Sequence, residues 1–195
     1  MSRSACRASA RLLVVLLGLV LSVPVAALAA DAATVEDYAA YQPQTKCRPK
    51  AKPGTTYLGH WLVRKYGGGF GSIARSCGGG TSEHLEGRAF DWTLDASRKA
   101  DRQRAKAFLD RAFRTDRHGN PDARARRMGI MYVIWKDRMY AAWDEFEPEP
   151  YLSSSCKTRR KCSKTLRHRD HLHVSLSRQG GRGETSWYAG RLPQG

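Results

Sequence analysis

The sequence has only one long apolar run, Leu12–Leu21, and this run is too short to cross a bilayer. Three arginines precede it, and Pro24 and an alanine-rich stretch follow. A basic start, a short apolar core and an Ala-x-Ala end are typical of a secretory signal peptide. We therefore predict that residues 1–29 are a signal peptide and that the protein is secreted; an uncleaved anchor helix is the alternative. Cys6 precedes the apolar core, where a lipoprotein cysteine cannot lie.

Acidic residues are also scarce. The chain has 18 Asp and Glu against 34 Lys and Arg, and removal of residues 1–29 would leave a formal charge of +13. Such an excess says nothing about fold, but it predicts attraction to polyanions. For a secreted protein of bacterial type these are peptidoglycan-associated or other anionic cell-wall polymers and membrane phosphates, with extracellular nucleic acid as the rival. Charge alone does not separate these partners.

Cysteine is sparse, and no Cys-x-x-Cys pair of the kind that zinc favours is present. Four cysteines lie beyond the predicted signal peptide: Cys47, Cys77, Cys156 and Cys162. An even number in an exported domain indicates disulfides. Because Cys156 and Cys162 flank a five-residue basic loop, we expect them to pair with each other and leave Cys47 for Cys77. A thiolate metal site is the alternative.

The chain has no internal repeat and no sign of a second domain. Three prolines make residues 30–53 an irregular lead-in, residues 54–178 form the expected domain, and the Gly- and Arg-rich residues 179–195 are predicted to be a flexible tail. We expect a monomer, since a chain of this size can bury a core of its own. Residues 144–169 form a long loop, which in compact domains is often functional or disordered.

Periodicity predicts the regular elements of the domain. Helical spacing of apolar residues predicts helices from Thr55 to the glycines at 67–69 and over 98–114, the second capped by Asp95 and Ser97. Alternation and turn residues predict strands over 71–77, 88–94, 130–135, 139–143 and 170–176. These elements indicate an α+β fold, with a small, mostly antiparallel sheet and flanking helices.

Residues that ligate metals gather in two short stretches. His84 and Asp91 lie in the stretch 82–92, and His171 and His173 lie in the stretch 168–174. Alternate residues of a strand share a face, so His171 and His173 are expected to point the same way, beside Asp91 if the two strands are neighbours. Two imidazoles, one carboxylate and an open fourth position describe a catalytic zinc site. We therefore expect Zn²⁺ as the cofactor.

Taken together, the two stretches resemble the zinc peptidases of the D-alanyl-D-alanine carboxypeptidase and hedgehog type. Their pattern of Ser-x-His-x-x-Gly-x-Ala-x-Asp, followed by an acid three residues before a final histidine, matches here at Ser82, His84, Gly87, Ala89, Asp91, Asp170 and His173. The resemblance covers roughly residues 70–177. It implies a hedgehog- or DD-peptidase-like zinc site on the α+β scaffold, and a hydrolase of peptidoglycan stem peptides, either a DD-carboxypeptidase or an endopeptidase.

The resemblance also implies roles for the residues, beginning with three zinc ligands: His84, Asp91 and His173. Asp170 would be the general base for the attacking water, and His171 would steady the developing oxyanion. His168 would donate a proton, and Arg75 would contact an oxyanion or a carboxylate of the substrate. Leu172 departs from the pattern, since several relatives have an aromatic residue there.

Other polar and aromatic residues near the two stretches receive more ordinary interpretations. We expect Glu83 and Glu86 to be solvated, although either could replace Asp170 as base. The aromatic residues of the predicted hairpin are expected to belong to the core rather than to a glycan platform: Tyr132, Trp135, Tyr140 and Trp143.

Two other functions are compatible with the sequence. A secreted nuclease of the His-Asn-His type would suit the charge, but it needs a helix carrying a histidine after the last strand, and only a Gly-rich segment follows Leu176. A wall-binding module that keeps zinc for structure alone would have the same ligands. Asp170 favours the enzyme, because a purely structural site needs no base.

Overall fold

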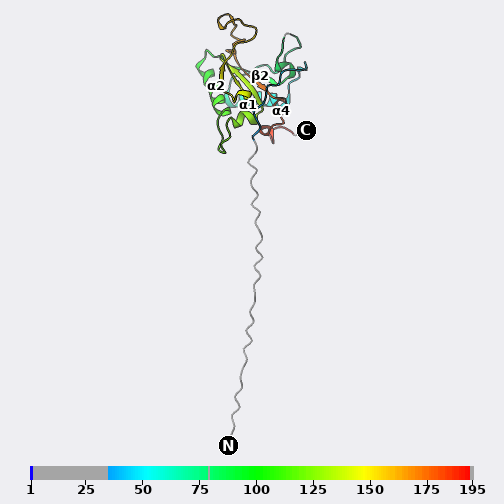
Figure 1. Cartoon of the computed structure of the whole chain (residues 1–195), viewed down its shortest axis with the longest axis vertical. Helices are drawn as coiled ribbons and strands as arrows, with labels where there is room; N and C mark the ends of the chain where they lie inside the picture. Colours follow the sequence, from blue (N-terminus) through cyan, green and yellow to red (C-terminus); the bar gives the residue numbers. More distant parts are fainter. Residues whose placement is uncertain (2–34, 79, 194–195) are drawn as a thin grey trace. The chain divides into compact units, whose positions relative to one another are not determined.

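A six-stranded antiparallel sheet forms the centre of the fold, in the strand order β1-β2-β6-β3-β4-β5. The computed structural model describes residues 1, 35–78 and 80–193, and the rest of the predicted signal peptide lies outside them (Figure 1). The strands are β1 (Gly69–Phe70), β2 (Ala89–Thr93), β3 (Ile130–Trp135), β4 (Arg138–Ala141), β5 (Pro148–Pro150) and β6 (His171–Leu176). The predicted α+β class is confirmed.

Helices cover one face of this sheet. They are α1 (Pro53–Tyr66), α2 (Lys99–Ala112), α3 (Ala123–Arg127) and α4 (Arg178–Arg182), with the 3₁₀ turns η1 (Glu83–Glu86), η2 (Ala142–Asp144), η3 (Arg159–Lys161) and η4 (Ser186–Tyr188). Phe90 and Trp92 of β2 are fully buried in one cluster with Leu58 of α1 and Phe108 of α2. Each such side chain contributes roughly 1.5–3 kcal/mol by leaving water. The strands therefore turn their apolar residues to the helices.

The opposite face of the sheet carries the polar residues of β2 and β6. Asp91 and His173 are directly opposite each other in the antiparallel register. His171, His173 and Ser175 alternate with the fully buried Leu172 and Val174, so all three share the face that points away from the helices. The alternation that builds the core thereby places two histidines beside one carboxylate.

Two local predictions were wrong: the strand over residues 71–77 and the side-chain cap of helix α2. Residues 71–77 form no strand, because their backbone makes single bonds, from Asp91 N to Ser72 O and from Arg75 N to His84 O, rather than a ladder. Helix α2 begins without a side-chain cap at its N-cap residue, Arg98. Asp95 accepts from Ser97 instead, at 2.8 Å from its backbone N and 2.7 Å from its Oγ.

The prediction of a flexible tail from residue 179 was also wrong for the part of it that the structure describes. Helix α4 and turn η4 lie there, and Trp187 and Tyr188 are buried against Tyr57 of α1. Gly180 allows this packing, since a Cβ on it would lie 2.8 Å from the carbonyl oxygen of Gly129. The glycines that suggested flexibility are positions of close backbone contact.

Disulfides fix the two irregular parts of the chain, as predicted. Cys47 is bonded to Cys77 and Cys156 to Cys162. The first bond ties the lead-in, which has no helix or strand over residues 35–52, to the segment before η1. The long loop 144–169 contains β5, η3 and the second bond. None of the helices in the described residues is both long and apolar enough to cross a membrane.

Candidate metal centre

Three side chains converge at the middle of the polar sheet face. His84 Nε2 lies 3.1 Å from Asp91 Oδ1 and 3.3 Å from His173 Nδ1, and His173 Nδ1 lies 3.0 Å from the same Asp91 oxygen. Zinc bonds of about 2.0–2.1 Å in a tetrahedron would separate ligand atoms by about 3.3 Å. The three atoms therefore have the spacing of a tetrahedral site, and these residues can hold a metal ion.

The local sequence fixes where His84 points. Ser82 caps the turn η1 by accepting a hydrogen bond from the backbone N of His84, and Gly87 ends the turn with a φ of 67°. A Cβ on Gly87 would lie 1.9 Å from the carbonyl oxygen of Lys50. Only glycine allows the chain to turn back here and enter β2, and this turn brings His84 to Asp91.

Each of the three residues is held by its other polar atom. The second ring nitrogen of His84 lies 2.8 Å from the carbonyl oxygen of Ile73, and that of His173 lies 2.8 Å from Ser175 Oγ. Asp91 Oδ2 accepts from Ser72 Oγ at 2.9 Å and from Arg75 Nη2 at 2.8 Å. Outer contacts of this kind fix the tautomer and orientation of metal ligands. Two held imidazoles and one carboxylate suit zinc.

The electrostatics favour the protonation states that a metal requires. Burial alone would raise the pKa of Asp91, but hydrogen bonds from His173 and His84 hold it well below its usual range. Burial lowers the pKa of His173, and Asp91 only partly opposes this effect. A carboxylate that stays ionised and an imidazole that stays neutral are both ready to coordinate.

A second group of histidines adjoins this centre and shares His173. His171 Nε2 lies 3.6 Å from Asp91 Oδ1, and the ring of His168 lies 4.7 Å from that of His171. His168, His171 and His173 could also surround a metal ion. His168 has a φ of 49°, and its Nδ1 has no hydrogen-bond partner among the described residues. Burial lowers the pKa of His168 to about 2, with further lowering by His173 and His171.

Asp170 supports His171 from outside the strand. Its Oδ1 lies 2.7 Å from His171 Nδ1, and its Oδ2 accepts from Thr165 Oγ1 at 2.5 Å. Strand β6 begins only at His171, so strand alternation does not dictate the direction of the Asp170 side chain. Burial raises the pKa of Asp170, but these two hydrogen bonds outweigh burial and lower it. Asp170 and His171 thus form an ionised carboxylate–imidazole pair beside Asp91.

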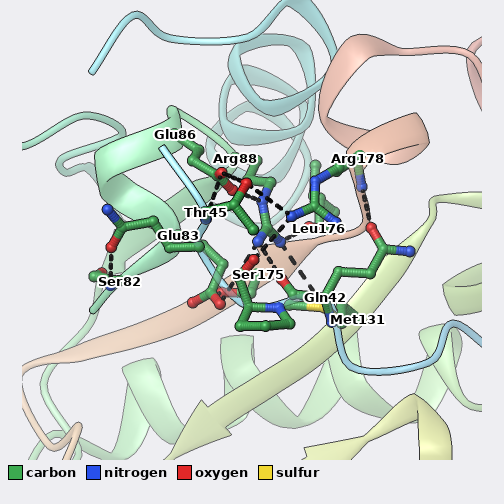
Figure 2. A network of polar contacts seen from close by, with 12 residues as sticks. Gln42, Thr45, Ser82, Glu83, Glu86, Arg88, Met131, Ser175, Leu176 and Arg178 are labelled. Carbon is green, nitrogen blue, oxygen red and sulfur yellow. Dashed lines mark hydrogen bonds and ion pairs between the residues drawn. The ribbon is translucent and has the colours of Figure 1, made fainter. Parts of the chain in front are cut away.

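Sequence reasoning missed a buried polar network behind His173, which Figure 2 shows around Arg88. Glu83 and Glu86 are not solvated as expected: Glu83 is 3% exposed, and Glu86 accepts from Arg88 Nε at 2.7 Å. Tyr132 donates its hydroxyl to Glu83, and Ser175 Oγ donates to the same carboxylate at 3.4 Å. Because Ser175 also contacts His173, the network extends to a candidate ligand. The position of Ser175 two residues after His173 could have suggested it.

The hairpin aromatics divide between core and surface. Tyr132 and Trp135 are buried as predicted, and Tyr132 stacks on His173 with ring centres 5.5 Å apart. Tyr140 is partly buried against the main core. Trp143 is 44% exposed, contrary to the prediction, because it follows the end of β4 in the turn η2.

The model of one protein family, described as VldE, C-terminal domain, matches residues 47–160. The matched segment includes His84 and Asp91 and ends before the second histidine stretch. No curated protein and no solved structure matches the chain. The resemblance to D-alanyl-D-alanine carboxypeptidases and hedgehog-type proteins therefore rests on the motif residues alone.

Proposed function

The chain belongs to the VldE C-terminal domain family, and from the geometry of its site we propose that it is a secreted zinc metallopeptidase that hydrolyses peptidoglycan stem peptides. The observation that carries this proposal is the spacing of His84, Asp91 and His173, at 3.0–3.3 Å between ligand atoms. The paired disulfides are compatible with export. The motif resemblance supplies the substrate class.

A zinc ion held by these three residues would polarise a peptide carbonyl. It would also lower the pKa of a bound water molecule to near neutrality. The chain's own residues then handle protons and substrate. His171 faces Asp91 with Nε2 while Asp170 holds its Nδ1, so a proton taken up at His171 Nε2 would be stabilised by the Asp170 carboxylate. Direct uptake by Asp170, the role that the motif implies, is also compatible with the geometry, because the contacts to Thr165 and His171 do not use all the lone pairs of its two oxygens.

Arg75 supports recognition of the substrate. Its guanidinium is half-exposed and bonds the outer oxygen of Asp91. A guanidinium keeps its charge and has several donors, so Arg75 can hold Asp91 and still present N–H groups to a substrate carboxylate or oxyanion. This placement agrees with a site that takes the charged end of a peptide.

Purified chain without residues 1–29 should be incubated with isolated peptidoglycan, with zinc and after chelation. Zinc-dependent release of free D-alanine is expected of a carboxypeptidase, and new amino groups without free D-alanine are expected of an endopeptidase. The Asp91→Ala variant is the matched control. Absence of both products in the zinc-loaded protein would sink the peptidase proposal. Wall binding with bound zinc and no turnover would instead identify a non-catalytic module.

The nuclease alternative is weakened for a different reason from the one given by the sequence. A helix does follow the last strand, since α4 begins at Arg178. That helix has the sequence Arg-Gln-Gly-Gly-Arg and carries no histidine, so it cannot supply the residue that a His-Asn-His site needs. Cleavage of plasmid DNA in the presence of magnesium would reverse this ranking.

A further inference from the structure

A basic pocket lies apart from the histidines, where the lead-in meets helix α4. It has a volume of about 320 Å³. Six of its lining residues are cationic: Lys46, Arg48, Lys52, Arg88, Arg178 and Arg182. The volume is at the lower end of the range for small-ligand sites. Three segments that are far apart in sequence therefore bring their positive charges to one concave surface.

Only part of this charge is neutralised within the protein. Arg88 pairs with Glu86 at 2.7 Å, and Arg182 pairs with Glu184 at 2.6 Å. No carboxylate of the described residues forms an ion pair with the four other cations of the pocket: Lys46, Arg48, Lys52 and Arg178. The pocket therefore keeps an excess of about four positive charges, and such a concentration attracts anions.

Part of the pocket wall is rigid. Arg88 is only 2% exposed, and its guanidinium donates to the backbone carbonyls of Leu176 and Gln42 as well as to Glu86. Arg178 donates to the carbonyl oxygen of Pro43 at 2.9 Å, and its backbone N donates to Gln42 Oε1 at 2.8 Å; Figure 2 shows Arg178 beside Gln42. A fixed wall and three exposed or half-buried cations at its rim form a ready-made anion site.

We propose that this pocket binds the phosphate groups of a polyol phosphate polymer. Arginine and lysine both suit phosphate, arginine as a fork and lysine as a point charge. The lining contains no aromatic side chain on which a nucleobase could stack. A polymer with recurring phosphates and no bases fits both observations, whereas single-stranded nucleic acid fits only the first. The site does not involve the histidines, so this proposal can be tested independently of peptide hydrolysis.

Binding of poly(glycerol phosphate) to the full chain without residues 1–29 tests the proposal. We expect the variant Lys46→Ala/Arg48→Ala/Lys52→Ala to bind roughly tenfold more weakly, because three charge contacts at the rim each contribute a few-fold. Inorganic phosphate should compete with the polymer better than chloride at equal ionic strength. The affinity of the variant should also depend less steeply on salt.

Two matched variants remove the same charge elsewhere. Lys99→Ala/Arg111→Ala/Arg114→Ala changes exposed residues of α2 and of the segment just after it, and Lys157→Ala/Arg159→Ala/Arg160→Ala changes the disulfide-closed loop. Both should bind within about threefold of the parent. A larger loss in either one than in the pocket variant would overturn the proposal, because net charge or the loop would then govern binding.

Two further arms keep the test decisive. The variant Lys46→Arg/Arg48→Lys/Lys52→Arg keeps the charge and should bind like the parent. The single variant Arg48→Glu keeps the test decisive if the triple alanine variant fails to fold, because near-parental binding by Arg48→Glu would contradict the proposal. A single-stranded DNA oligomer of equal charge should bind more weakly than the polymer. If it binds more tightly, and the pocket variant loses that binding, the ligand is nucleic acid and the assignment is wrong.

Discussion

The two histidine groups share His173 but differ in how firmly they are held. In the first group, His84 and Asp91 join His173, and every polar atom that does not face the centre has a partner in the protein. In the second group, His168 and His171 join His173, but His168 Nδ1 has no partner among the described residues. All three residues of the first group are buried, whereas His168 of the second group is partly exposed; the side chains of His171 and Asp91 are equally exposed, at 12%.

This difference indicates which group is suited to bind a metal ion and which to transfer protons beside it. A ligand group must keep its geometry, so outer contacts such as those of Ile73 and Ser175 belong to it. A group that handles protons must keep an atom for water or substrate: Asp170 holds His171 Nδ1, whereas His171 Nε2 lies 3.6 Å from Asp91 Oδ1, beyond hydrogen-bond distance. We therefore expect the first group to hold the metal and His171 of the second group to handle protons.

The largest expected effect is on metal binding itself. Asp91→Ala removes the carboxylate that faces both ligand imidazoles, and we expect zinc affinity to fall by more than about 100-fold, beyond the usual loss for an outer contact. His168→Asn, in the second group, should bind zinc like the parent. Titration with a competing chelator measures both. If His168→Asn loses zinc and Asp91→Ala keeps it, the assignment of the two groups is reversed.

The next effect concerns hydrolysis at constant metal content. Asp170→Asn keeps the shape of the side chain and removes its basicity, so we expect near-normal zinc and a loss of roughly 10²–10⁴-fold in peptide hydrolysis. The carboxylate contacts His171 and Thr165 and does not belong to either histidine group. Zinc content and the rate of D-alanine release are measured on the same sample. A parental rate would show that Asp170 neither takes the proton nor supports His171 in taking it, and lost zinc would make Asp170 a ligand.

A smaller effect is expected from the support of His173. Ser175→Ala leaves the ring nitrogen that lies 2.8 Å from the hydroxyl without its partner, which should weaken zinc binding about 10–100-fold. Ser72→Ala is the control, because Asp91 Oδ2 would keep Arg75 as a donor. We expect Ser72→Ala to cost less. Equal affinities for the parent and Ser175→Ala would show that the buried network does not support the metal.

Much of the fold was accessible from sequence because its periodicities are simple. The helical spacing of Leu58 and Leu62 predicted α1, and alternation predicted the strands that became β2 and β6. The tail was predicted wrongly because composition does not tell a flexible glycine from one in close contact. Gly180, which packs against Gly129, is of the second kind.

The candidate ligands were predicted from motif spacing, and the structure brings those residues together. Their supports could not be predicted in the same way. The carbonyl of Ile73 has no side-chain signature, and the burial of Glu83 depends on Tyr132 and Arg88, which are distant in sequence. Contacts of this kind exist only after the chain has folded.

The last expected effect is on stability as a function of pH, in the metal-free protein. Burial lowers the pKa of His168 from its ordinary 6.5 to about 2, so below pH 6.5 the unfolded chain takes up a proton that the folded chain does not. Stability from this group is complete above pH 6.5 and is lost as pH falls, at up to about 1.4 kcal/mol per pH unit. His173 acts in the same direction.

The variant His168→Asn tests this pH dependence, and asparagine tolerates the φ of 49° at this position. Between pH 6.5 and pH 3.8, the free energy of unfolding of the variant should fall less steeply with falling pH, by up to that amount per pH unit. Below pH 3.8, the ordinary pKa of an aspartate, Asp91 also contributes. Urea unfolding after chelation, repeated at several pH values, measures how the free energy of unfolding changes with pH. The control is His118→Asn, in an exposed turn. If His168→Asn leaves this pH dependence unchanged while His118→Asn alters it, His168 is not held neutral in the folded protein, and this contrast between the two histidine groups fails.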